Sequence, residues 1–481
     1  MTMDDVSPRA CRALRRFVIA AGLALAMVGA ALAQDDGAGS QRLAPRMPEG
    51  DFVGPREVVE LDGRLIFSAY NARHGLELWR ADPASGSAAL AVDIRPGWRS
   101  SGPSWLTRLG AHVYFAADDG EHGIELWRSD GTPNGTALVA DVRRGPGDST
   151  PSYFVVYAGW LWFVADDGEH GFELWKTDGS AASTQIVKDL RPGPQGANPR
   201  QLTVVGDRLF FTATTDDNGH ELWVIDHPNA APRLVKDIRE GREDATPQHL
   251  TVVASSLFFV ADDGIHGLEL WKSDGTARGT TLVKDIRPGR DGGRPAYLTA
   301  LGNRLLFAAQ DERGNELWAS DGTADGTRLV KDIRAGAASS QPSFITAWGD
   351  AVYFAATEDA RSVQLWKSDG TEQGTIALTN ANDTPGGPSP ARLARGDGVL
   401  LFAATDPAHG HELWQSDGTP GGTRLVQDLI AGPADSFPDR FVVVRQGTVF
   451  VALDAYGNER LWLRTGAAVR LIGDPLTEKV R

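Results

Sequence analysis

The amino-acid sequence predicts an all-β protein, a β-propeller of about nine four-stranded blades. A Leu-Trp pair returns nine times at intervals of 48 residues, with one interval of 47. A proline also returns nine times, again at 48-residue intervals with one of 47. Short apolar segments separated by Gly-rich turns lie between these markers. A repeat of this length is typical of arrays, solenoids and propellers.

The tryptophans and the prolines have the same spacing, including the single interval of 47, so both divide the chain into the same nine units. The repeated tryptophans are Trp79, Trp127, Trp175, Trp223, Trp271, Trp318, Trp366, Trp414 and Trp462. The repeated prolines are Pro55, Pro103, Pro151, Pro199, Pro247, Pro295, Pro342, Pro390 and Pro438. Because a 48-residue unit is too small to bury a core alone, the units must pack on one another.

Each unit has the pattern of a four-stranded meander. In the unit that starts at Pro199, strands are expected at residues 202–205, 209–213, 221–225 and 233–238. Gly206 and the aspartate after it supply a tight hairpin turn between the first two.

The second strand of a unit is continuously apolar, as at residues 257–260 and 305–308. Such runs predict burial on both faces of the sheet, whereas strict alternation would leave one face in water. Radial stacking of blades buries both faces, and the two side chains of the Leu-Trp pair should pack against different neighbouring blades. A linear β-solenoid is the alternative. It would need atypical capping units, but the first and last units have complete strand content.

The N-terminus predicts export. Arginines precede an apolar run from Phe17 to Ala30, and Ala31-Leu32-Ala33 resembles a signal-peptidase site. We therefore expect a signal peptide at residues 1–33, a flexible leader at 34–54, the nine repeats at 55–475 and a tail at 476–481. The protein is then periplasmic, secreted or on the cell surface, with no integral membrane span once the signal is removed.

Cysteine content and charge restrict the chemistry. The single cysteine, Cys11, lies in the predicted signal, so the mature chain has no disulfide or thiolate site. The formal net charge of -15 disfavours nucleic acid and anionic membranes. We expect a monomer that binds a protein or a glycan.

A second repeated motif follows the tryptophan. Ser-Asp-Gly-Thr-x-x-Gly-Thr occurs at residues 129–136, 273–280, 320–327, 368–375 and 416–423. Asp and Ser side chains cap turn amides and Gly takes a positive φ, so this motif predicts a hairpin between the third and fourth strands. Aspartates near the end of the fourth strand, often preceded by lysine, are expected to form ordinary hydrogen bonds or ion pairs.

The combined pattern Glu-Leu-Trp-x-x-Asp-Gly-Thr, as at residues 269–276 and 412–419, resembles the ELWxxDGT repeat family of bacterial exported proteins, often described as hyalin-like. The resemblance covers about residues 55–475 and implies repeat architecture and export. It supplies no catalytic residues. The chain departs from the pattern at Gln364 and Arg460, which stand in the Glu position, and at Asp82-Pro83.

Paired acidic residues precede the tryptophan strand in four units. Adjacent carboxylates together with backbone carbonyls could coordinate Ca²⁺, although the spacing is not that of an EF-hand. Solvated turns are the alternative interpretation. The candidate metal ligands are Asp118, Asp119, Asp166, Asp167, Asp216, Asp217, Asp262 and Asp263.

Function is expected where the units differ, because nearly identical units provide no asymmetric catalytic set. Aromatic residues and histidines near the crossovers and first strands could form a sugar or peptide platform, or could fill blade cores. These candidates are Trp98, Trp105, His112, His249, Tyr297 and Trp348. The favoured function is a binding or scaffold module. The alternatives are a Ca²⁺-stabilised adhesin and a propeller glycan hydrolase or lyase.

Overall fold

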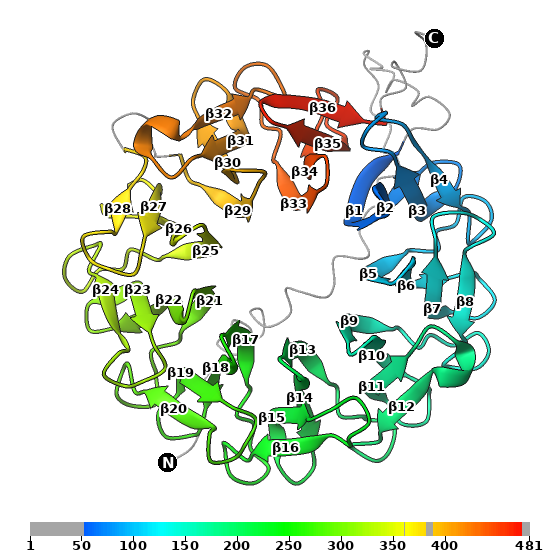
Figure 1. Cartoon of the computed structure of the whole chain (residues 1–481), viewed down its shortest axis with the longest axis horizontal. Helices are drawn as coiled ribbons and strands as arrows, with labels where there is room; N and C mark the ends of the chain where they lie inside the picture. Colours follow the sequence, from blue (N-terminus) through cyan, green and yellow to red (C-terminus); the bar gives the residue numbers. More distant parts are fainter. Residues whose placement is uncertain (1–51, 360, 381–387, 474–481) are drawn as a thin grey trace, which may run out of the picture. The chain divides into compact units, whose positions relative to one another are not determined.

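In the computed structural model, nine four-stranded antiparallel sheets surround a common axis (Figure 1). The structure describes residues 52–359, 361–380 and 388–473. Contacts divide the chain into two units, Met1–Met47 and Pro48–Arg481, and all described residues belong to the second. The predicted propeller is therefore confirmed, with nine blades, numbered here in chain order.

The first strand of each blade lies closest to the axis and the fourth lies at the rim (Figure 1). The first strands are β1 (Val53–Leu61), β5 (Ser104–Leu109), β9 (Ser152–Tyr157), β13 (Arg200–Val205), β17 (Gln248–Val253), β21 (Ala296–Leu301), β25 (Ser343–Trp348), β29 (Ala391–Arg395) and β33 (Asp439–Val444). The second strands are β2 (Arg64–Asn71), β6 (His112–Asp118), β10 (Trp160–Asp166), β14 (Arg208–Thr215), β18 (Ser256–Asp262), β22 (Arg304–Asp311), β26 (Ala351–Ala356), β30 (Leu400–Asp406) and β34 (Gly447–Leu453).

The outer two strands of each blade carry the repeated motifs. The third strands are β3 (Gly75–Ala81), β7 (Ile124–Ser129), β11 (Phe172–Thr177), β15 (Gly219–Ile225), β19 (Leu268–Ser273), β23 (Gly314–Ser320), β27 (Gln364–Ser368), β31 (Gly410–Ser416) and β35 (Glu459–Thr465). The fourth strands are β4 (Ala88–Val92), β8 (Ala137–Ala140), β12 (Gln185–Lys188), β16 (Arg233–Lys236), β20 (Thr281–Lys284), β24 (Arg328–Lys331), β28 (Ile376–Ala377), β32 (Arg424–Gln427) and β36 (Ala468–Ile472). Two short 3-10 helices, η1 (Ala181–Ser183) and η2 (Pro420–Gly422), lie between third and fourth strands.

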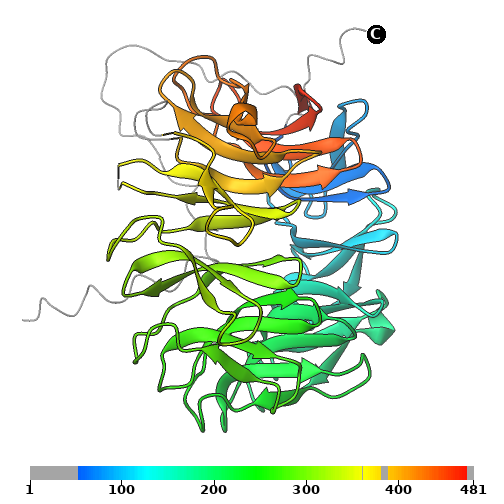
Figure 2. The same cartoon turned by 60° about the vertical axis from the view of Figure 1, so that its left-hand side comes forward.

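The hydrophobic core lies between the blades. In blade 4, Phe210 packs in a cluster with blade 5, whereas its neighbour Phe211 packs in a cluster with blade 3. Leu222 and Trp223 divide in the same way. This confirms the prediction for the Leu-Trp pair, and it follows from the alternation of side chains along a strand. Figure 2 shows the resulting face-to-face stacking of neighbouring sheets.

The ring closes between blade 1 and blade 9, and each of these sheets is formed from consecutive strands of its own. Phe52 is fully buried in a cluster with Val449 and Ile472. Gly473 N donates to Gly86 O at 2.8 Å, and Arg445 N donates to Glu60 Oε2 at 3.0 Å. Terminal blades that pack on one another exclude the linear solenoid.

The array begins earlier than the sequence predicted, because β1 starts at Val53, and Phe52 packs against Phe67 and Trp79. The predicted signal peptide, most of the predicted leader and the tail lie outside the described residues. No helix within the described part of the chain is long and apolar enough to cross a membrane.

Candidate functional site

Two positions in every blade have a positive φ, the residue just before the repeated proline and the residue two places after it. The residue two places after the repeated proline has a positive φ in all nine first strands, although none of the nine is glycine. This set, called the axial ring here, consists of Glu57 (φ 51°), Trp105 (60°), Tyr153 (54°), Gln201 (52°), His249 (58°), Tyr297 (54°), Phe344 (54°), Arg392 (56°) and Arg440 (55°).

A β-bulge produces this conformation. In blade 2, Ser104 pairs with Ala116 and Thr107 pairs with Tyr114, so Trp105 and Leu106 together oppose one residue of β6. A bulge bends its strand and redirects a side chain. The left-handed region costs a bulky L-residue about 1–2 kcal/mol, and such strain tends to be kept at functional sites. The axial ring is therefore the strongest structural candidate for a site.

Aromatic members of the axial ring are exposed on the innermost strands. The exposed fractions of Trp105, Tyr153 and Tyr297 are 40%, 36% and 45%. The rings of Trp105 and Tyr153 lie 5.0 Å apart between centroids, and those of Tyr297 and Phe344 lie 6.2 Å apart. Each pair bridges two adjacent blades. Exposed aromatic side chains with a polar edge are favourable contacts for a partner molecule.

Four polar members of the axial ring instead bind the adjacent blade, and one of them is Arg392, whose Nε lies 3.6 Å from Asp439 Oδ1. Glu57 Oε2 accepts Leu106 N at 2.8 Å, and Gln201 Nε2 donates to Pro247 O at 3.0 Å. Arg440 Nη1 donates to Pro55 O at 3.0 Å, across the closure of the ring. These four residues fasten the inner strands to one another, so the aromatic members remain as the candidate contact residues.

The sequence-based binding candidates separate into three places. Trp105, His249 and Tyr297 belong to the axial ring. Trp98, which is 74% exposed, lies in the crossover between β4 and β5, with the Arg99 guanidinium 5.8 Å from its ring. His112 begins β6, directly after the hairpin turn that follows β5. It therefore lies at the opposite end of the blade's strands from the crossover, which leads into the start of β5.

Trp348, the sixth candidate, ends β25 on the same side as His112. Its ring lies 5.6 Å from that of Tyr353 and packs against an interblade core. The sequence analysis did not identify Tyr153 and Phe344. Their fixed offset of two residues from the repeated proline was a usable signal, but nothing local indicated that this position takes a positive φ.

The first aspartate of each acidic pair binds an arginine of the preceding blade. Asp118 pairs with Arg95, and Asp216 pairs with Arg191 at 2.8 Å. Asp166 pairs with Arg143, and Asp262 with Arg239, each at 3.5 Å. These contacts join neighbouring blades.

The second aspartate of the pair organises its own loop. Asp119 accepts hydrogen bonds from the backbone amides of Glu121 and His122 and contacts His122 Nδ1 at 2.8 Å. Asp167 and Asp263 make the equivalent contacts to the histidines of their loops, whereas Asp217 is exposed. Hydrogen bonding to Asp119 raises the pKa of His122. Within the described ranges, no group of three or more His, Cys, Asp or Glu side chains is arranged to hold a metal ion.

The glutamate of the Glu-Leu-Trp motif has a role that the sequence analysis missed. Glu125 is fully buried, and its carboxylate accepts Val142 N at 2.8 Å, Ser149 N at 3.1 Å and Ser149 Oγ at 2.7 Å. Burial raises its pKa to about 7. The carboxylate thereby fixes the crossover that leads into β9. Ser149, its partner there, precedes Tyr153 of the axial ring by four residues.

Corresponding glutamates are buried in seven blades, and burial raises the pKa of each. They are Glu77, Glu125, Glu173, Glu221, Glu269, Glu316 and Glu412. The pKa rises most for Glu221, to about 8. Because these carboxyl groups lie inside the blades and bind backbone amides, they are structural groups.

The Ser-Asp-Gly-Thr turn also joins blades. Asp274 Oδ1 accepts Thr276 N at 2.8 Å, as the turn chemistry predicts. In addition, Lys236 of the preceding fourth strand donates to Thr280 O at 3.0 Å. Among the described contacts, the fourth-strand lysines form no ion pair with the aspartates that follow them. Four of the aspartates accept a backbone amide of their own blade, as Asp237 does from Gly241 at 3.1 Å, and Asp93 contacts His74 Nδ1 at 2.7 Å.

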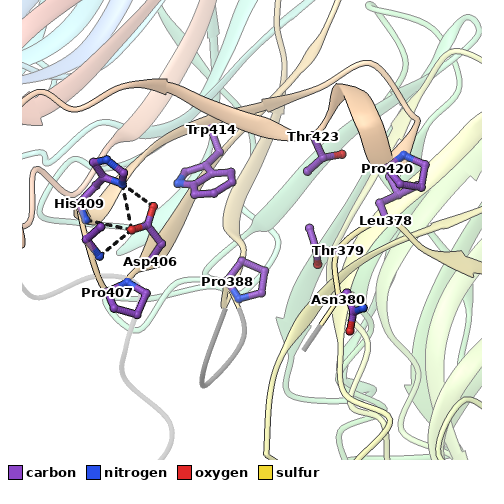
Figure 3. A pocket seen from close by; sticks show the side chains of 11 residues that line it. Leu378, Thr379, Asn380, Pro388, Asp406, Pro407, His409, Trp414, Pro420 and Thr423 are labelled. Carbon is purple, nitrogen blue, oxygen red and sulfur yellow. Dashed lines mark hydrogen bonds and ion pairs between the residues drawn. The ribbon is translucent and has the colours of Figure 1, made fainter. Parts of the chain in front are cut away.

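A cavity of about 560 Å³ lies between blades 7 and 8 (Figure 3). Trp414 of β31, Leu378 and several prolines supply its apolar lining, and Thr379, Thr423 and the Asp406–His409 pair supply polar groups. His409 Nδ1 lies 2.8 Å from Asp406 Oδ2, and this contact raises the pKa of His409. The cavity occurs where the fourth strand β28 is reduced to two residues.

No protein-family model matches the chain, and no curated protein matches its sequence. Solved structures resemble it at low identity. A puromycin hydrolase is 13% identical with a TM-score of 0.39; the match covers 83% of this chain and 58% of that one. A structure from a study of two prolyl endopeptidases is 12% identical with a TM-score of 0.41, covering 74% of this chain and 55% of that one.

The β-propeller domain of the Trilobed protease from Pyrococcus furiosus, described as having an open velcro topology, is 11% identical with a TM-score of 0.36. That match covers 67% of this chain and 97% of the domain. The chain spans less than two thirds of the length of the hydrolase and endopeptidase structures. Its own strand order defines the class of protein, a nine-bladed β-propeller.

Proposed function

We propose that the protein is an exported binding module that holds a protein or glycan partner against the axial ring. The observation that carries this proposal is the set of exposed aromatic residues held at a strained backbone position on the innermost strands. Non-glycine residues also have a positive φ just before the proline in seven blades, so the exposure of the aromatic side chains is the stronger argument for binding. Aromatic side chains provide a large contact area at a low cost in conformational entropy.

Variation around the ring also supports binding. The outer strands repeat almost unchanged, whereas the axial ring presents a different side chain in nearly every blade. Trp105 and Tyr153 form one aromatic pair, and Tyr297 and Phe344 form another. Such a surface can distinguish partners by shape and by the position of polar groups, as an interface centre does.

Export and membership in the ELWxxDGT family belong to the same proposal. The apolar N-terminal run with its small-residue site and the repeated Glu-Leu-Trp-x-x-Asp-Gly-Thr pattern support them. A propeller exported to the periplasm or the cell surface would meet envelope proteins and glycans. Binding is favoured over catalysis, because the carboxyl groups whose pKa is most raised are buried inside the blades.

Arrays of envelope glycans and peptides, probed with the mature protein, test the proposal. We expect the wild-type protein to bind a defined subset, and a Trp105→Ala, Tyr153→Ala double variant to lose at least about tenfold in affinity. The matched control is Tyr456→Ala. Tyr456 is 77% exposed but lies in the loop between β34 and β35, away from the axial ring.

A wild-type protein that binds no array component would contradict the proposal. Equal loss of binding in the Tyr456→Ala control would also contradict it, because the effect would not be specific to the axial ring. Circular dichroism and thermal melting of each variant establish that the compared proteins are folded.

A further inference from the structure

In blades 4 and 6, a lysine of the fourth strand covers the tryptophan of the next blade. Lys236 Nζ lies 5.6 Å from the centroid of the Trp271 ring, and Lys331 Nζ lies 5.7 Å from that of Trp366. Lys331 also donates to Thr375 O at 2.8 Å. The ammonium group therefore has two partners in the next blade, an indole face and a backbone carbonyl. An indole is the best aromatic partner for such a cation.

Lys284 makes the same carbonyl contact, to Thr327 O at 2.7 Å. Trp271 and Trp366, which follow blades that carry this lysine, are buried. Trp175 is also buried, although Ala140 stands at the lysine position of the blade before it. The exposed fractions of Trp271 and Trp366 are 5% and 4%.

Blade 7 lacks this lysine, as do blades 1, 2 and 8, which have Val92, Ala140 and Gln427 at the same position. Lys331 follows Thr327 by four residues, and the residue four places after Thr375 is Thr379. The threonine side chain is too short to reach the next blade as lysine does. Trp414, the tryptophan that would be covered, is only partly buried.

The cavity between blades 7 and 8 occupies this place. Trp414, Thr423 and Thr379 all line it. Trp414 and Thr423 are the blade 8 counterparts of the indole and the threonine that Lys331 contacts in blade 7. In the view of Figure 3, the indole ring of Trp414 lies between the Asp406–His409 pair and Thr423.

We propose that this cavity binds the primary alkylammonium group of a ligand. The group would take the position that the fourth-strand lysine of the preceding blade occupies in blades 5, 6 and 7. The indole face of Trp414 and the Thr423 carbonyl would receive the ammonium group, as their counterparts receive Lys331. The chain's formal net charge of -15 favours a cation. The carboxylate of Asp406 is already paired with His409 at 2.8 Å, so the indole and the carbonyl are the main partners of the ammonium group. This site is separate from the axial ring, so it goes beyond the proposed function.

The size of the cavity limits the ligand class. A volume of about 560 Å³ falls within the range of small-molecule sites and exceeds what an ammonium group needs. Leu378 and Pro388 provide apolar contacts for an attached carbon chain. Both a lysine side chain of a peptide and a free diamine have this chemistry.

Isothermal titration of the mature protein tests the proposal with three probes. These are Nα-acetyl-lysine methylamide, its norleucine analogue, which lacks the ammonium group, and 1,5-diaminopentane. We expect one site, with the lysine probe binding at least about tenfold more tightly than the norleucine probe. Tighter binding of the diamine would identify a free amine as the source, and tighter binding of the lysine probe would identify a peptide.

Two variants make the test specific. Thr379→Lys restores the internal lysine and should abolish binding, whereas Thr379→Ser should leave it unchanged. Equal affinity for the lysine and norleucine probes, absence of binding to wild type, or unchanged binding in Thr379→Lys would each overturn the proposal.

Discussion

Ser149 Oγ donates to the buried carboxylate of Glu125 at 2.7 Å, across 24 residues of sequence. Ser149 lies at the end of the crossover from blade 2 to blade 3, and Glu125 lies on β7, directly before the Leu-Trp pair. This contact connects the repeated motif on the third strand of blade 2 to the crossover that leads into β9, the strand that bears Tyr153. The glutamate therefore positions the axial ring, although it does not line it.

Replacing Glu125 with glutamine should lower the free energy of unfolding by about 1–3 kcal/mol. One oxygen accepts Val142 N and the other accepts Ser149 N, so an amide NH₂ would face a backbone donor on one side. Urea unfolding measures the change. Glu121→Gln, an exposed glutamate in the preceding loop, is the control and should have no effect.

Stability should fall as the pH rises from about 5 to 8. Burial raises the pKa of Glu125 to about 7 and that of Glu221 to about 8, from the ordinary glutamate value of 4.5. Between the unfolded and folded pKa values, the folded protein binds more protons than the unfolded chain, so the free energy of unfolding decreases with pH. Urea unfolding at several pH values measures this slope.

A Glu221→Gln variant should show a smaller decrease over the same pH range, because one of the titrating groups is removed. Stability that instead increased steadily from pH 5 to 8 would show that these carboxyl groups do not titrate as their burial implies.

Trp79→Ala should destabilise the protein by about 3–5 kcal/mol, because a fully buried indole between blades 1 and 9 is replaced by a cavity. Trp127 is only partly buried, so the same change there should cost less. Trp98→Ala removes an exposed indole and is the control. Equal stability of Trp79→Ala and wild type would contradict the assignment of this residue to the core.

At Trp105, glycine should be more stable than alanine by about 1 kcal/mol, the reverse of the usual order for a strand. The φ of 60° strains alanine but not glycine. Comparing the unfolding free energies of Trp105→Gly and Trp105→Ala isolates this backbone effect. At Leu106, which follows it without a positive φ, alanine should be the more stable of the two.

Addition of Ca²⁺ should leave the melting temperature unchanged relative to EDTA. Asp118 and Asp119 already have an arginine, backbone amides and a histidine as partners, and a bound ion would have to displace them. An ion that binds only the folded state raises its stability by mass action. A clear increase with Ca²⁺ would support the adhesin alternative.

The sequence alone determined the architecture. The period of the Leu-Trp pair gave the number of blades, and the continuous apolar second strands predicted burial on both faces. These features were readable because each depends on local patterning that nine units repeat. The division of Leu222 and Trp223 between two neighbouring blades followed from strand alternation alone.

Only the tertiary structure decided which residues form the candidate sites. The positive φ of Trp105 arises from a bulge against β6, the ion pair of Asp118 requires Arg95 of another blade, and Thr379 and Trp414 of two different blades line one cavity. The reason is physical. Each of these features is a contact between two strands or two blades, and the residue preferences within one strand carry no information about such contacts.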